Sequence, residues 1–312
     1  MGPSRELDIE TKKKFRFTFN VTRSFNAEGG HSETGGLTTD GRLIEIGNHW
    51  HHVSMSMSRF NLGLHYQLNP RTKLALVLPY SIKNQSAEIE WEASNPSASA
   101  QDAAIRNGYI HHRDETYRGF EDLNLATSYH WNGFTSIKND RITLSAGLSI
   151  PTGKIEPDPY KLGDVGKKHL HLQFGTGTFT PSFQVIYILP VNDSLSVQSR
   201  LSFRRPFYEN KYSFLSPPET STYFGIALKV SNILRLHGSW MVLRQGFGYW
   251  DGNRDRNTGI QMHALQLGTN TTIGRKNPLN ISVILPIHQK MLSTGDTFDH
   301  GILLSSSVSH VF

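Results

Sequence analysis

Residues 15–21 read Phe15-Arg-Phe-Thr-Phe-Asn-Val21, with an apolar side chain at every second position. This spacing is typical of a β-strand, because successive side chains of a strand point to opposite faces of the sheet. The same alternation recurs in residues 74–82, 123–131, 142–150, 224–230, 279–287 and 302–312. With the less regular strands between them, the pattern predicts about twelve strands. No segment keeps a helical period over three turns, so we predict an all-β chain.

The connections between the predicted strands alternate in length. Long polar connections are predicted at residues 26–48, 83–116, 151–168, 204–219, 244–259 and 288–299, and short turns at 67–72, 132–140, 190–193, 231–233 and 274–278. Gathering all long loops at one end is typical of outer-membrane barrels, and strands of about ten residues match a tilted bilayer span. We therefore predict a membrane-spanning antiparallel up-and-down β-barrel, with short periplasmic turns, long extracellular loops and both chain ends in the periplasm.

The barrel is predicted to occupy residues 13–312 as a single domain, after an N-terminal periplasmic tail at 1–12. The chain begins without the basic stretch and apolar segment of a signal peptide. We expect either a protein that is not exported or a mature sequence with a new start. In the second case Met1-Gly-Pro-Ser4 could be a remnant of cloning.

Two stretches leave the regular pattern. Apolar side chains occupy odd positions at Met55 and Met57 and even positions from Phe60 onward. This change of phase predicts a β-bulge at 58–59 and places both methionines on the lipid-facing side. Residues 169–189 are predicted to form one long strand.

The composition fits strands, not helices, as the membrane-crossing elements. The 312 residues are 37% hydrophobic with a mean hydropathy of −0.40, and the longest apolar runs span only a few residues. A membrane helix needs about 18 apolar residues in a row. Aromatic residues gather near the predicted strand ends, which is typical of interfacial girdles. The absence of cysteine excludes disulfides, thiolate metal sites and cysteine nucleophiles. A soluble β-protein is the alternative, but it has no reason to gather its long loops at one end.

Three segments carry a family resemblance: Gly119-Phe-Glu-Asp-Leu-Asn-Leu-Ala-Thr-Ser-Tyr129, Leu144-Ser-Ala-Gly-Leu-Ser-Ile-Pro-Thr-Gly-Lys154 and Leu172-Gln-Phe-Gly-Thr-Gly-Thr-Phe-Thr-Pro-Ser-Phe183. Their order and spacing resemble the outer-membrane family named for the MetA pathway of phenol degradation. The close match covers about 119–190, and Phe120-Glu121-Asp122 departs from that family's plain Gly-Asp form. The resemblance implies an outer-membrane channel or transporter for small aromatic or hydrophobic compounds. We expect the motif residues Pro151, Gly153, Gly175 and Gly177 to be architectural.

The strand phases predict a basic lumen. The inward positions include Lys14, Arg16, Arg141, His171, Arg200, Lys229, Arg235, His237 and His263. Confined positive charges raise the local concentration of anions and are the usual basis of anion preference in pores. The alternative is that these charges pair with inward acids such as Glu121 and fill a narrow barrel.

Other chemistry is weakly indicated. His49, His51 and His52, near Met55, are weak candidates for a soft-metal site, and we expect no metal or other cofactor. His237-Gly238-Ser239 has the spacing of outer-membrane phospholipases, but its phase is inward, so no enzyme is predicted. A pI of 9.4 favours acidic partners. No nucleic-acid motif is present, and we assign the charge to lipopolysaccharide phosphates and the lumen.

The sequence thus predicts a channel of the Gram-negative outer membrane for passive passage of small hydrophobic or aromatic compounds, including those that carry an anionic group. The alternatives are an anion-preferring porin and a non-conducting barrel that serves as scaffold or adhesin. The expected partners are outer-membrane lipid, lipopolysaccharide, the small-molecule permeant and the barrel-assembly machinery. The last would recognise the C-terminal strand ending in Phe312.

Overall fold

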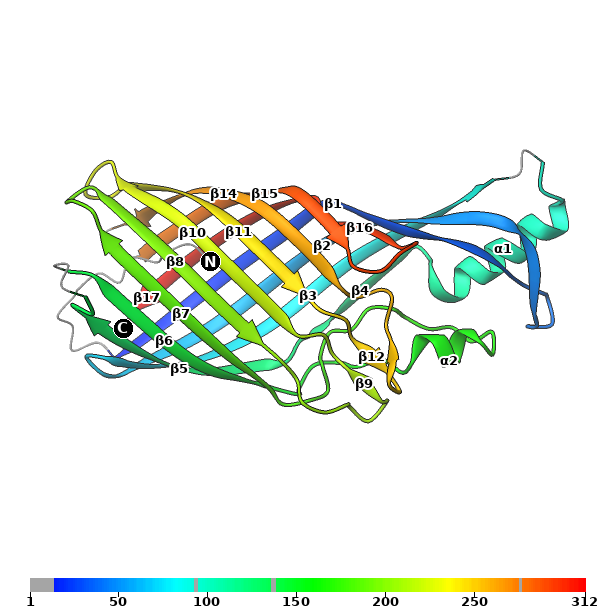
Figure 1. The fold of residues 1–312 in the computed structure, drawn as a ribbon, viewed down its shortest axis with the longest axis horizontal. Helices are drawn as coiled ribbons and strands as arrows, with labels where there is room; N and C mark the ends of the chain where they lie inside the picture. Colours follow the sequence, from blue (N-terminus) through cyan, green and yellow to red (C-terminus); the bar gives the residue numbers. More distant parts are fainter. Residues whose placement is uncertain (1–13, 93–94, 136–138, 275–276) are drawn as a thin grey trace.

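The computed structural model describes residues 14–92, 95–135, 139–274 and 277–312, so the predicted tail at 1–12 lies outside the described residues. The main sheet closes because β1 (Phe15–Leu37) pairs with both β2 (Leu43–Asn69) and β17 (Ile302–Val311). The wall continues through β3 (Thr72–Trp91), β5 (Leu123–Asn132), β6 (Arg141–Ile150), β7 (Thr180–Pro190), β8 (Leu195–Arg204), β10 (Glu219–Lys229), β11 (Arg235–Gln245), β14 (Ile260–Ile273) and β15 (Asn277–Met291). Since β4 (Glu115–Phe120) continues the line of β5 along β3, the barrel has the predicted twelve antiparallel strands (Figure 1).

The remaining elements lie at the end of the barrel opposite the short turns (Figure 1). They are α1 (Ala98–His111), α2 (Pro159–Gly163), β16 (Thr297–Asp299) and a small sheet of β9 (Phe214–Leu215), β12 (Tyr249–Trp250) and β13 (Asn253–Arg254). The predicted division into short periplasmic turns and long extracellular connections is confirmed.

The barrel closes next to the last residue of the chain. The Phe15 and Phe312 backbones exchange hydrogen bonds of 3.4 and 3.0 Å, and their rings stack with centroids 6.1 Å apart. Phe312 is therefore a seam residue with a 54% exposed side chain. Its recognition by the assembly machinery stays a prediction.

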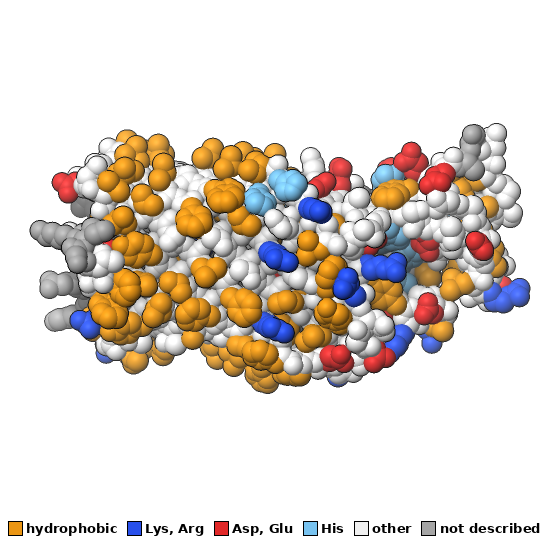
Figure 2. Space-filling model, viewed as in Figure 1, with side chains coloured by type: hydrophobic (Ala, Val, Ile, Leu, Met, Phe, Trp, Pro, Cys, Tyr) orange, Lys and Arg blue, Asp and Glu red, His pale blue; other side chains and the backbone are white. Residues whose placement is uncertain are grey.

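The outer face of the wall is apolar over a limited height. The outward positions of β3 are apolar from Leu74 to Ile82 and polar from Asn84 to Glu90. Figure 2 shows hydrophobic side chains over the barrel wall, while most acidic side chains lie toward the end that carries α1. Such a band is what a barrel presents to lipid. None of the helices among the described residues is long and apolar enough to span a membrane, a finding that does not bear on strands.

The first strands are longer than predicted. β1 and β2 continue as a paired hairpin well above the apolar band, so most of the predicted 26–48 loop is strand. A β-bulge lies in β1 between Ser24 and Ala27, where Asn26 has φ of 55°, and the β1–β2 register shifts again between Glu33 and Gly35. No register shift occurs at 58–59 in β2, so the predicted bulge there is wrong.

Met55 and Met57 face inward, contrary to the prediction. They share the inward phase of Asn61 and line a cavity, while Ser54 and Ser56 face outward. The apolar phase changes because β2 leaves the lipid: within the bilayer the outer face is apolar, and above it the outer face meets water.

Helix α1 was missed from the sequence. Ser97 caps its N-terminus by accepting a hydrogen bond from the Ala100 backbone N–H. Its alanine-rich sequence favours helix, but its apolar face is weak because it packs along the β1–β2 hairpin through small side chains such as Ala103 and Ala104.

Residues 169–179 form an irregular segment, so the predicted 169–189 strand is wrong and only β7 is formed. Hydrogen bonds to the Asp122 side chain take the place of strand pairing in this segment. One of its carboxylate oxygens accepts hydrogen bonds from the Thr176 N–H and hydroxyl, both 2.7 Å, and the other accepts from the Gly153 N–H at 3.0 Å. A Cβ at Gly175 would come within 2.6 Å of the Asp122 carboxylate and 2.8 Å of Gly153. The three segments that carry the family resemblance thus meet at one buried carboxylate.

We expect Asp122→Ala to destabilise the barrel by about 3 kcal/mol or more, because three donors to one buried acceptor lose their partner. The measurement is urea unfolding in lipid vesicles, followed by tryptophan fluorescence. Asp193→Ala, in an exposed short turn, is the matched control and should leave the midpoint unchanged. Equal midpoints for the two variants would contradict this role of Asp122.

Candidate functional site: two cavities inside the barrel

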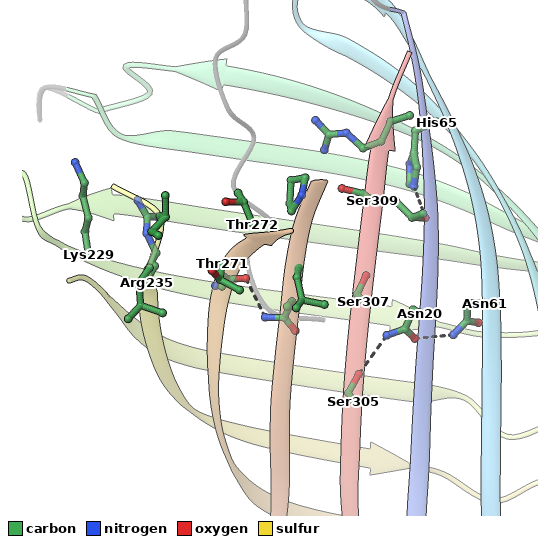
Figure 3. A pocket seen from close by; sticks show the side chains of 18 of the residues that line it. Asn20, Asn61, His65, Lys229, Arg235, Thr271, Thr272, Ser305, Ser307 and Ser309 are labelled. Atoms are coloured by element: carbon green, nitrogen blue, oxygen red, sulfur yellow. Dashed lines mark hydrogen bonds between the residues drawn. The ribbon is translucent and has the colours of Figure 1, made fainter. Parts of the chain in front are cut away.

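The lower cavity lies at the short-turn end of the lumen and measures about 180 Å³ (Figure 3). Its wall comes from β1, β2, β3, β10, β11, β14, β15 and β17, and the turn 231–234 lines it as well. Four Lys and Arg side chains line it, with His65 as a fifth basic group, and no lining residue is acidic. The four are Arg16, Lys73, Lys229 and Arg235. Such a wall attracts anions.

Small polar side chains complete this wall. The Asn61 amide donates to the Asn20 side-chain oxygen at 2.9 Å, and the Asn20 amide donates to the Ser305 hydroxyl at 3.2 Å (Figure 3). The Asn280 amide donates to the Asn270 oxygen at 2.9 Å. These bonds run across strand boundaries, so they hold the inner wall in place while leaving a polar surface.

The upper cavity lies toward the extracellular end and measures about 490 Å³. Its lining mixes apolar and polar residues, and both come partly from extracellular segments. The apolar lining residues are Val53, Met55, Met57, Leu170, Leu172, Leu243, Ile260, Met291 and Phe298. The segment 170–172 reaches this cavity because the Lys83 ammonium donates to the Gln173 carbonyl at 3.0 Å and lies 4.7 Å from the centre of the Phe174 ring.

A layer of buried side chains on β10, β14 and β15 lies between the lower and the upper cavity, while a third cavity of about 300 Å³ follows the inner face of β5 to β11. On β14, Ile260 and Met262 lie above Gln266, which is 1% exposed, and Asn270 below it lines the lower cavity. Tyr223 and Ser282, both 2% exposed, belong to the same layer. The Arg200 guanidinium lies 4.8 Å from the centre of the Tyr223 ring. We call this layer the partition.

The structure places most of the predicted lumen residues inward. Arg16, Lys229 and Arg235 line the lower cavity, and Arg200 and buried His237 face the partition. Arg141 faces inward at the short-turn end of β6, and exposed Lys14 precedes β1.

Two predicted positions need correction. His171 lies in the loop 164–179 and not on a strand, although it lines the upper cavity. His263 shares the outward phase of Leu265, and its ring lies 5.6 Å from that of outward-facing Trp240. Its inward assignment is wrong, because Ala264 and Gln266 take the inner face of β14.

The structure also shows where the candidates for metal binding and for phospholipase chemistry lie. His52 faces outward and bonds to Glu90 at 2.7 Å, whereas His49 and His51 are buried at the extracellular end. His237 and Ser239 both face inward, and His237 contacts the Asn270 amide at 3.2 Å, so no lipid-facing pair forms. Lys73 and His65 of the lower cavity were missed, although both alternate with apolar neighbours on their strands.

The fold is similar to that of an outer membrane channel from Pseudomonas putida F1, with a TM-score of 0.58, 13% identity and 95% of each chain covered. The P. putida toluene transporter TodX (TM-score 0.46, 9% identity, 97% of this chain and 91% of that one) and the Ralstonia pickettii toluene transporter TbuX (0.42, 8%, 97% and 90%) are more distant. No family model and no curated protein sequence matches the chain, so the MetA-pathway resemblance stays a prediction. At these identities the likeness concerns the fold alone. The closed twelve-stranded wall and its apolar band, together with the likeness in fold to an outer membrane channel, identify the chain as a β-barrel of the bacterial outer membrane.

Proposed function

We propose that the protein is a passive, non-enzymatic channel for small aromatic or hydrophobic molecules that carry an anionic group, such as aromatic carboxylates. The observation that carries this proposal is the order of the two cavities along one lumen. A partly apolar cavity faces the outside, and a cavity whose charged lining residues are all basic faces the periplasm.

Each cavity suits one half of such a permeant. An apolar cavity of about 150 Å³ is enough to hold benzene, and both cavities exceed that volume. The methionine side chains of the upper cavity are adaptable and polarisable, which favours contact with aromatic rings. The basic side chains of the lower cavity, Arg16, Lys73, Lys229 and Arg235, then favour the carboxylate.

The test compares three solutes in proteoliposomes at pH 8: benzoate, acetate and benzylammonium. Uptake into protein-free liposomes is subtracted. We expect benzoate to enter about tenfold faster than either of the others, since acetate lacks the ring and benzylammonium has the wrong charge. Equal rates for benzoate and acetate would indicate a simple anion porin. Equal rates for benzoate and benzylammonium would remove the basis for the lower cavity as an anion site.

The partition favours a second candidate, a barrel that does not conduct and serves as a scaffold or adhesin. Its buried residues Tyr223, Gln266 and Ser282 fill space between the lower and the upper cavity. Absence of conductance in planar bilayers, from protein that shows the heat-modifiable gel migration of a folded barrel, would select this candidate.

A further inference from the structure

Seven histidines gather above the apolar band of the barrel. They come from β1 (His31), β2 (His49, His51), the end of α1 (His111, His112) and the loop that follows α2 (His169, His171). The His51 ring lies 5.1 Å from that of His111 and 5.6 Å from that of His31. Because the outward neighbours on β3, Glu88 and Glu90, are polar, the cluster lies outside the bilayer.

The ring nitrogens of this cluster converge. One nitrogen from each of His31, His51, His111 and His112 can be chosen so that all four lie within 4.8 Å of one another. An oxygen of Glu33 lies among them, 3.7 Å from His31 Nε2, 3.8 Å from His51 Nε2 and 3.2 Å from His111 Nε2. The other Glu33 oxygen accepts a hydrogen bond from the Asn107 amide at 2.9 Å, which fixes the carboxylate.

Backbone carbonyls orient several of the rings. His111 Nδ1 lies 2.7 Å from the Asn107 carbonyl, and His49 Nδ1 lies 2.9 Å from the Gly47 carbonyl. A ring that donates from Nδ1 leaves the Nε2 lone pair for another partner, and this is how metal-binding histidines are commonly held. Within the described part of the chain, His49 Nε2 and both nitrogens of His51 are buried without a hydrogen bond. His51 as a whole is 1% exposed.

The buried rings lack partners for their nitrogens. A neutral imidazole carries one N–H and one lone pair, and both His51 nitrogens are buried without a hydrogen bond within the described residues. A buried polar group without a partner is unfavourable, and a cation bound at the lone pair would compensate for this.

We propose that this cluster binds one divalent transition-metal ion, with His31, His51, His111 and His112 as ligands and Glu33 beside them. Imidazole nitrogens suit zinc, copper and nickel, whereas calcium and magnesium require oxygen ligands. His31, His111 and His112 also line the upper cavity, which provides an entry path. Glu33 and His51 also belong to a second convergent group, with His49, so the two groups share ligands. The ion would tie the end of α1 to the β1–β2 hairpin.

The test uses the full chain, purified in detergent without a histidine tag, stripped with EDTA and dialysed against micromolar Zn²⁺. We expect one zinc per chain by elemental mass spectrometry. His51→Gln and His111→Gln should each weaken binding more than tenfold. His52→Gln is the matched control, because His52 adjoins His51 in sequence but faces outward and bonds to Glu90. Heat-modifiable migration confirms that each variant is folded.

Two further measurements keep the outcome decisive. Asn107→Ala leaves all proposed ligands in place and should weaken zinc binding about tenfold, as for other groups that orient ligands. Cu²⁺ should quench the fluorescence of Trp91, whose ring lies 4.9 Å from that of His49. The part of the quenching that is lost in Trp91→Phe is the part that belongs to Trp91. Absence of stoichiometric zinc in the wild-type protein, or equal zinc binding by folded His51→Gln and His52→Gln, would overturn the proposal.

Discussion

Replacing Arg16 and Lys229 with glutamate is expected to abolish the anion preference of the channel, because Lys73 and Arg235 then only balance the two new negative charges. The two residues line the same cavity from separate strands, β1 and β10, so the changed charges face the permeant from both. At an effective dielectric constant of about 20, two unit charges about 8 Å apart interact by about 2 kcal/mol. Salt screening reduces this value, but a tenfold change in preference requires only about 1.4 kcal/mol.

The measurement is the zero-current potential of planar bilayers across a KCl gradient. The wild-type potential should be shifted toward that of chloride, and the potential of the double variant should lie close to zero. Arg235→Ala and Arg200→Ala should each reduce the chloride preference without abolishing it. Arg42→Glu with Lys211→Glu makes the same change of charge on exposed extracellular segments and should leave the potential nearly unchanged. A double variant at Arg16 and Lys229 with the wild-type potential would show that the lower cavity does not set selectivity.

On part of the wall, strand alternation indicated which residues face the lumen, whereas on β14 it failed at His263. Alternation on β1, β10 and β11 placed Arg16, Lys229 and Arg235 correctly, because lipid on one side and lumen on the other leave no ambiguity of phase. The same rule would have found Lys73, which alternates with Leu74 on β3.

Above the bilayer this rule fails. There the outer face meets water and the inner face packs against α1 and the loop 151–179, so Met55 and Met57 were assigned to the wrong face. The histidine cluster joins four segments that are distant in sequence. The pairs His31-x-Glu33 and His49-x-His51 indicate one shared face on each strand, but only the β1–β2 register brings the two pairs together.

Tyr223→Ala is expected to increase single-channel conductance several-fold. The Tyr223 side chain is 2% exposed and belongs to the partition between the lower and the upper cavity, so its removal leaves a gap in that layer. The Arg200 guanidinium, which now lies 4.8 Å from the centre of the ring, would lose this contact. We therefore expect higher conductance together with weaker discrimination between benzoate and acetate, because the permeant would no longer pass a tight layer.

Two control variants separate this effect from a general loosening of the barrel. Tyr223→Phe keeps the ring and removes only the hydroxyl, so its conductance should match that of the wild type. Tyr129→Ala removes a ring from the lipid-facing side of β5, where Tyr129 is 40% exposed, and should leave conductance unchanged. If Tyr223→Ala conducts like the wild type while folding normally, the partition does not limit passage. If instead the wild type is silent and Tyr223→Ala conducts, the partition is the closed gate of the channel, and the lumen on either side of it is already wide enough to conduct.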